Sequence, residues 1–132
     1  MNTISKFALI ALLSLAPLAH AGKDVAFNIP VKLEKMDPLV SSVMVVCIVL
    51  NDQNQSLATA MSPGAAVQNG AYQGNHAATV NVPDDKLGLA KKWNCSLRIM
   101  ATGGNLWFAI DTFGQHWTKA SPGAVAEQSG NF

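Results

Sequence analysis

The sequence predicts a small antiparallel β-sandwich that contains one disulfide bond. Apolar and polar residues alternate with a period of two over several short stretches, as they do in half-buried strands. Turn-forming residues separate these stretches at intervals of about eight to twelve residues, which is typical of all-β sandwiches. The chain has two cysteines, Cys47 and Cys95, and each lies within one of the apolar stretches.

Residues 1–21 are predicted to be a secretory signal peptide. Lys6 supplies a positive charge, residues 7–16 are apolar, and Ala19-His20-Ala21 matches the small-x-small cleavage site. The apolar run is shorter than the roughly 20 residues that a helix needs to span a bilayer. No later stretch is long and apolar enough to do so. We therefore expect a periplasmic or secreted mature chain, beginning at Gly22, without a transmembrane helix.

The length of 132 residues allows one domain, and 49% of the residues are hydrophobic while 13% are charged. This composition is typical of a folded chain rather than a disordered one. We expect the β-sandwich domain to occupy residues 22–118. Residues 119–132 are rich in Ala, Ser, Gly and polar groups, and are predicted to form a flexible C-terminal tail.

The charge balance excludes two classes of partner. The full chain has a formal charge of +1, and removal of Lys6 with the signal peptide brings the mature chain to zero. A nucleic-acid-binding protein needs an excess of cations to displace phosphate counterions, so nucleic acid is not expected as a partner. A polybasic patch for anionic membrane surfaces is also missing.

The two cysteines are expected to form a disulfide bond, because an exported chain folds in an oxidising compartment. Only one pairing is possible. Cys47 and Cys95 are 48 positions apart, and closing a loop of that length stabilises a protein by about 4 kcal/mol in the chain-entropy treatment. The chain has no Cys-x-x-Cys motif, so a thioredoxin-like redox function is not indicated.

The first two predicted strands differ in how many of their faces are apolar. Residues 25–33 alternate, and Pro30 within them lacks a backbone donor, which places this strand at a sheet edge. Residues 42–51 are apolar on both faces. Such a strand is either central with its outer face covered, or part of a protein–protein contact. The outer face to be explained consists of Met44, Val46, Ile48 and Leu50.

Turn signals delimit the next elements. A polar turn at residues 51–55 leads into a weaker strand at residues 57–61. Asn69-Gly70 favours a tight hairpin turn, because both residue types tolerate positive φ. Alternation returns over residues 72–82, and Asp84 or Asp85 could cap a helical turn at residues 87–92.

The last two predicted strands contain the second cysteine and several aromatic residues. Residues 93–101 place Trp93 and Cys95 on the inner face. Gly103-Gly104-Asn105 then forms a turn, and residues 106–112 form the final clear strand.

A cysteine on an early strand, a second one about fifty residues later and an aromatic residue two positions before it resemble the immunoglobulin-like framework. Here these residues are Cys47, Cys95 and Trp93. The resemblance implies a sandwich, immunoglobulin-like in general architecture, whose disulfide joins the two sheets. The core tryptophan and the Asp-x-Gly/Ala-x-Tyr-x-Cys motif of true immunoglobulin domains are missing. The resemblance therefore extends to architecture and carries no function.

The mature chain has two histidines. His76 lies on the inward face of its predicted strand and is expected to be partly buried and hydrogen-bonded, whereas His116 is expected at the surface beside Trp117. A metal site would need further ligands at suitable spacing, and a cofactor would need a phosphate-binding or dinucleotide motif. Neither is present, so no metal and no cofactor are expected.

Trp107 and Trp117 are candidates for exposed aromatic residues, which favour recognition of a protein, a peptide or a sugar ring. Together with His76 and His116 they form the predicted binding residues. We expect an exported β-sandwich that acts as a binding or assembly module with a protein or glycan partner. Two alternatives stay open: an enzyme or enzyme inhibitor whose site has no local motif, and a subunit of a surface polymer completed by strand exchange.

Overall fold

The computed structural model describes residues 22–104, 106–109 and 127–132. The predictions for the signal peptide, His116 and Trp117 lie outside these residues. The elements are β1 (Gly22–Leu33), β2 (Val40–Leu50), β3 (Ser56–Met61), β4 (Ala65–Ala66), β5 (Tyr72–Pro83), α1 (Asp84–Leu87), β6 (Lys92–Ala101), β7 (Trp107–Ala109) and β8 (Glu127–Asn131).

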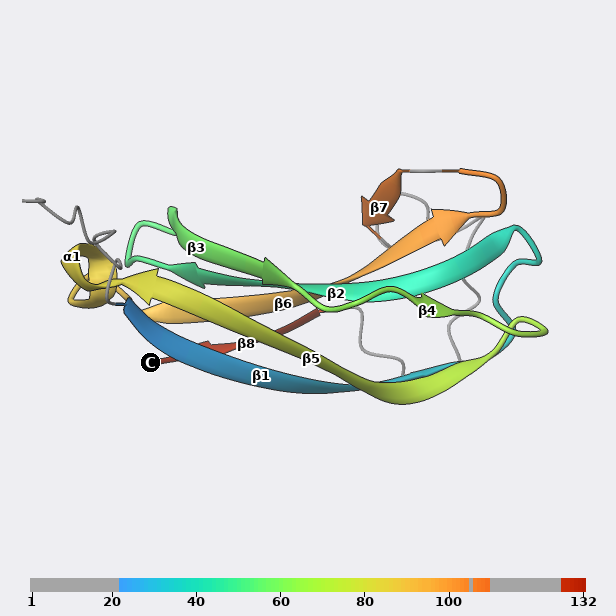
Figure 1. Ribbon diagram of the computed structural model, residues 1–132, viewed down its shortest axis with the longest axis horizontal. Coiled ribbons are helices and arrows are strands. Elements are labelled where there is room, and N and C mark those ends of the chain that lie inside the picture. Colours follow the sequence, from blue (N-terminus) through green and yellow to red (C-terminus); the bar gives the residue numbers. More distant parts are fainter. Residues whose placement is uncertain (1–21, 105, 110–126) are drawn as a thin grey trace, which may run out of the picture.

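The strands form two antiparallel sheets, which confirms the predicted all-β sandwich (Figure 1). The smaller sheet consists of β1 and β5, which pair without interruption from Gly22–Pro83 to Leu33–Tyr72. The larger sheet has the order β3-β2-β6-β7. In that sheet β4 also pairs with β2, and β8 also pairs with β6.

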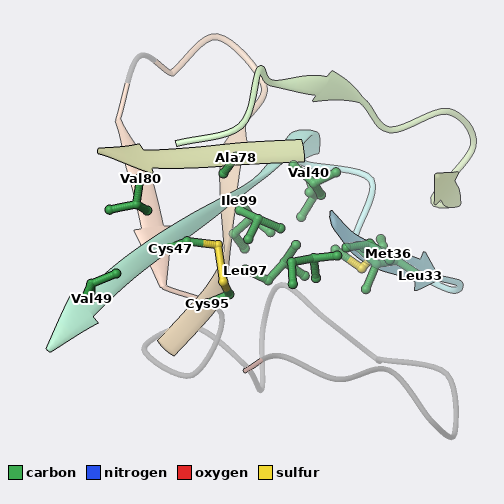
Figure 2. Close-up of a cluster of buried hydrophobic side chains, with 14 of the residues drawn as sticks. Leu33, Met36, Val40, Cys47, Val49, Ala78, Val80, Cys95, Leu97 and Ile99 are labelled. Carbon is green, nitrogen blue, oxygen red and sulfur yellow. A yellow bond between two sulfur atoms is a disulfide. The ribbon is translucent and has the colours of Figure 1, made fainter. Parts of the chain in front are cut away.

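The period of two in the sequence explains how the sheets pack. Every second residue of β1 from Ile29 to Leu33 is buried, as is every second residue of β5 from His76 to Val82. The inner faces of β2 and β6 meet them in one apolar core (Figure 2). The core side chains that are nearly inaccessible to solvent are Leu33, Val43, Val45, Cys47, Val49, Val80, Val82, Cys95 and Ile99.

The disulfide between Cys47 and Cys95 is confirmed, but its predicted position between the two sheets is wrong. Cys47 of β2 lies directly opposite Cys95 of β6 in the larger sheet, with the two Cα atoms 4.0 Å apart. The bond therefore joins neighbouring strands, and its sulfur atoms lie in the core (Figure 2). This position differs from the immunoglobulin framework, in which the disulfide links opposite sheets.

The predicted flexible tail is wrong for Glu127–Asn131, which form β8 and pair with β6 from Lys92 to Ser96. Gly130 lies opposite Trp93. A β-carbon at Gly130 would approach the Trp93 indole to 2.7 Å, so a glycine is needed for the strand to lie this close.

The structure confirms the predicted tight turn at Asn69-Gly70 and corrects the predicted helical turn. Asn69 and Gly70 have φ values of 52° and 71°, and Gln68 pairs with Ala71 across this tight turn. The predicted helical turn begins earlier than expected, at Asp84, and its N-cap residue is Pro83 without a side-chain capping bond. Neither aspartate therefore caps it; both lie in its first turn, where carboxylates interact favourably with the free N–H groups.

Candidate functional site

The outer face of the larger sheet carries an apolar stripe, which we define as Val46, Ile48 and Leu50 of β2 together with Met61 of β3. Met61 lies directly opposite Val46, and its side chain is 64% exposed. The three β2 side chains are half-buried. On the other side of β2, the residues of β6 that lie opposite the stripe are polar: Ser96, Asn94 and Lys92. The stripe is thus bordered by groups that can form hydrogen bonds.

The Met44 end of the predicted outer face is not accessible to solvent. Trp107 is half-buried, and a β-carbon at Gly64 would lie 3.1 Å from Cη2 and Cζ2 of its indole. Trp107 of β7 lies opposite Met100 of β6, which in turn lies opposite Ser42 of β2. Met44, two residues further along β2 than Ser42, is only 6% exposed. Met44 therefore does not belong to the accessible stripe.

The outer face of the smaller sheet is polar by contrast. Its exposed residues on β5 alternate with the core residues, and they are Gln73, Asn75, Ala77, Thr79 and Asn81. The two outer faces of the sandwich thus differ in character, and the apolar stripe belongs to the sheet that contains the disulfide.

His76 faces inward and is hydrogen-bonded, as predicted, but it is more completely buried than expected, and it contacts a serine that the sequence did not single out. The exposed fractions of His76 and Ser62 are 3% and 4%. The Ser62 hydroxyl lies 2.8 Å from Nδ1 of His76 and accepts a hydrogen bond of 2.9 Å from the backbone N–H of Val45. Ser62 N–H in turn donates to the carbonyl of Val45 at 2.9 Å. Ser62 thus extends the ladder of the larger sheet and connects it to β5.

The donors and acceptors around His76 favour one tautomer of its ring. The Ser62 hydroxyl can donate only one hydrogen, either to the Pro63 carbonyl at 3.3 Å or to Nδ1 of His76. If the Ser62 hydroxyl donates to the Pro63 carbonyl, His76 must carry its proton on Nδ1 and donate it to the Ser62 oxygen. The other ring nitrogen, Nε2, is then an acceptor, and it is the ring atom left without a partner among the described residues. The other choice would bury an unpaired N–H, which is rarer in proteins. We infer the Nδ1–H form.

This pair is not arranged for nucleophilic catalysis. The Ser62 oxygen is buried and already accepts a backbone hydrogen bond, so it has no access to a substrate. Asp85 lies beyond the end of β5, roughly 24 Å along the strand direction from His76. The Tyr72 ring lies beside the imidazole, with the ring centroids 5.2 Å apart and the ring planes tilted by 47°. Within the described parts of the chain, no three His, Cys, Asp or Glu side chains could hold a metal ion.

A shallow hollow of about 410 Å³ lies between the β2–β3 turn and β8. Lys92 lines it, and its ammonium donates to Oδ1 of Asn54 at 3.1 Å. Among the described residues that line the hollow there is no carboxylate or imidazole. It lies beside the Leu50 end of the apolar stripe and adds polar groups to that end.

We expect the stability of the protein to fall as the pH drops below about 6.5. Burial lowers the pKa of His76 below its ordinary value of 6.5, although the Pro63 carbonyl opposes this shift. Below pH 6.5 the unfolded chain therefore binds a proton that the folded chain does not. Each pH unit between the two pKa values costs up to about 1.4 kcal/mol.

Urea unfolding of the wild type and of His76→Asn at pH 7.5 and 5.5 measures this contribution. The variant should lose less stability over this interval than the wild type. An equal loss in both proteins would assign the acid sensitivity to other groups.

Within the described ranges 22–104, 106–109 and 127–132, no helix is long and apolar enough to cross a membrane. Of the four predicted binding residues, the structure places His76 in the core and Trp107 against Gly64. It does not bring these two together in one open site. No protein-family model, curated protein or solved structure matches this chain.

Proposed function

We propose that this protein is an exported β-sandwich that binds or assembles with a protein partner through the apolar stripe of Val46, Ile48, Leu50 and Met61. The observation that carries the proposal is the difference between the two outer faces. A solvated sheet face normally alternates to polar residues, as the smaller sheet does. The larger sheet instead presents exposed Met61 beside half-buried aliphatic side chains, with a polar border of the kind that surrounds protein contacts.

A protein partner fits this face better than a glycan does. Sugar rings are usually bound on an open aromatic surface, and Trp107 is half-buried against Gly64. The stripe itself is aliphatic and thioether in character, which suits packing against another protein surface. An enzymatic function has less support, because Ser62 and His76 are buried and hydrogen-bonded to structural groups.

Export to the periplasm or the medium is part of the proposal. Residues 1–21 have the three parts of a signal peptide in order. A disulfide in the core is typical of proteins that fold in an oxidising compartment. Cleavage after Ala21 is expected, and the intact mass of the exported protein tests it. A mass that includes Met1 would contradict the proposal.

Capture of partners from the native cell envelope, with the disulfide intact, tests the stripe. Met61→Lys should reduce capture of a protein bound by the wild type at least about tenfold, because it places a charge in an apolar contact. Met61 is exposed in the free protein, so the substitution should leave stability within about 0.5 kcal/mol.

Ala77→Lys is the matched control, because it adds the same charge to the polar outer face of β5. Its capture profile should equal that of the wild type. The proposal is wrong if the two lysine variants lose the same partners, or if neither loses any.

A further inference from the structure

The outer edge of β1 has the features of a strand that can pair with a further strand. β1 pairs with β5 alone among the described strands, and it lies along the margin of the sandwich (Figure 1). Its register with β5 is continuous over 12 residues, with no bulge to twist the edge away. Long regular edges of this kind are ready to pair with another strand unless specific features prevent it.

The direction of the backbone groups on this edge follows from the contact at Gly22. A β-carbon at Gly22 would lie 2.8 Å from the carbonyl oxygen of Val82, so this carbonyl points towards β1. Val82 and its partner Lys23 are therefore in the hydrogen-bonded phase of the ladder. The even-numbered residues of β1 direct their N–H and C=O groups away from β5. Pro30 falls in this outward phase, where it removes no bond within the molecule.

The exposed side chains of the same outward phase are arranged in a self-complementary order. They are Asp24, Ala26, Asn28, Pro30 and Lys32. If two copies of β1 pair antiparallel about a two-fold axis at Asn28, Asp24 of each copy lies opposite Lys32 of the other. Opposite charges in directly facing positions stabilise such a pair and select its register.

Neighbouring registers lack this complementarity. A shift of two residues in one direction places Asp24 opposite Glu34 of the second copy, and a shift in the other places it opposite Pro30. Within the single chain Lys32 contacts Glu34 at 3.2 Å and Asp24 accepts a bond from Asn81 at 2.7 Å. Both contacts are solvent-exposed, so these side chains remain able to reach a facing strand.

The inner side of the same register is apolar. Val25 and Phe27 are only half-buried, whereas Ile29 and Val31 are core residues. In the pairing centred on Asn28, Val25 lies opposite Val31 of the second copy and Phe27 lies opposite Ile29 of the second copy. These are non-hydrogen-bonded positions, where facing side chains approach most closely. Pairing would therefore cover two apolar side chains that the single chain leaves partly exposed.

We propose that the protein forms a symmetric homodimer through antiparallel pairing of β1 with β1 of a second copy, centred on Asn28. The smaller sheets of the two copies then join into one four-stranded sheet of order β5-β1-β1-β5. Each Ala26–Pro30 pair keeps one of its two backbone bonds, because proline lacks the donor. The dimer uses an edge of the smaller sheet and is independent of the apolar stripe on the larger one.

Sedimentation equilibrium of the exported protein, from micromolar to about millimolar concentration, tests the proposal. The wild type should show a concentration-dependent dimer. Asp24→Lys or Lys32→Asp places two like-charged pairs across the edge and should raise the dissociation constant at least about tenfold. The double exchange Asp24→Lys with Lys32→Asp restores the complementarity and should restore the dimer.

Mixing the two single variants tests directly whether residues 24 and 32 face each other across the dimer. In a mixed dimer, the lysine introduced by Asp24→Lys in one chain faces the aspartate introduced by Lys32→Asp in the other. The unchanged Lys32 of the first chain likewise faces the unchanged Asp24 of the second. Each variant alone should be monomeric at a concentration at which the mixture is dimeric. Asp52→Lys, which makes the same charge change on the exposed β2–β3 turn, should leave the wild-type dimer unchanged.

Asn28→Pro provides a backbone test that does not depend on charge. Asn28 directs its N–H away from β5, so proline there should leave unfolding by urea little changed while it removes both bonds at the axis. A wild type that stays monomeric up to about 1 mM overturns the proposal. A dimer that tolerates both Asp24→Lys and Asn28→Pro also overturns it.

Discussion

Replacing Cys47 and Cys95 together by alanine should lower the free energy of unfolding by about 4 kcal/mol. The bond closes a loop of 48 residues, and without it the unfolded chain regains the entropy that this closure removes. A domain of this size has a total stability of roughly 5–15 kcal/mol, so the loss is a large part of it. Both cysteines are in the core, and the smaller alanine side chains add the cost of a small cavity.

Urea unfolding followed by circular dichroism measures this loss in the oxidised wild type and in the double variant. The wild type with its bond reduced is the control, because it has the same open chain but keeps both sulfur atoms. It should be destabilised nearly as much as the double variant. If the double variant unfolds within about 1 kcal/mol of the oxidised wild type, the stabilising role of the loop closure is disproved.

The alternation of residue types was sufficient to predict most of the strands and their inner faces. The inward side chains of β1 and β5 are those that the period of two selects. Pro30 lies on a strand that has one partner among the described strands, which agrees with its missing donor. These features depend on residues close together in sequence. The fold class follows from them because such strands can bury their apolar faces only by packing two sheets together.

The position of the disulfide could not be obtained in the same way. Cys47 and Cys95 both face inward, and this condition is met equally by strands that face each other across the core and by strands side by side in one sheet. Which strands become neighbours is decided by contacts distant in sequence. The strand β8 could not be predicted for the same reason. The advantage of glycine at position 130 arises only from its place beside the indole of Trp93, which is distant in sequence.

The candidate site was predicted only in part for a related reason. Val46, Ile48 and Leu50 were recognisable as a second apolar face from the sequence of β2 alone. That Met61 extends this face depends on the pairing of β2 with β3, and that Met44 is excluded from it depends on its burial in the folded chain. Exposure of a face is a property of the assembled sheet.

Ser62→Ala should lower the free energy of unfolding by roughly 2–6 kcal/mol. The substitution leaves two buried groups without a partner, the backbone N–H of Val45 and Nδ1 of His76, and each unsatisfied group costs about 1–3 kcal/mol. The Ser-Pro-Gly sequence that begins at Ser62 is typical of a surface turn, where such a change would be nearly neutral. The large effect arises because Ser62 extends the ladder of β2 and carries the only buried hydroxyl among the described residues.

Ser56→Ala is the matched control, because the Ser56 hydroxyl is exposed and contacts only Thr59 at 3.3 Å. It should change stability by less than about 0.5 kcal/mol. In a double-mutant cycle with His76→Leu, the loss from Ser62→Ala should shrink, since Nδ1 is then no longer present to be left unpaired. What remains should approach the cost of the Val45 N–H alone. Additive losses in the cycle would mean that Ser62 and His76 do not stabilise one another, and that the 2.8 Å contact is one of proximity only.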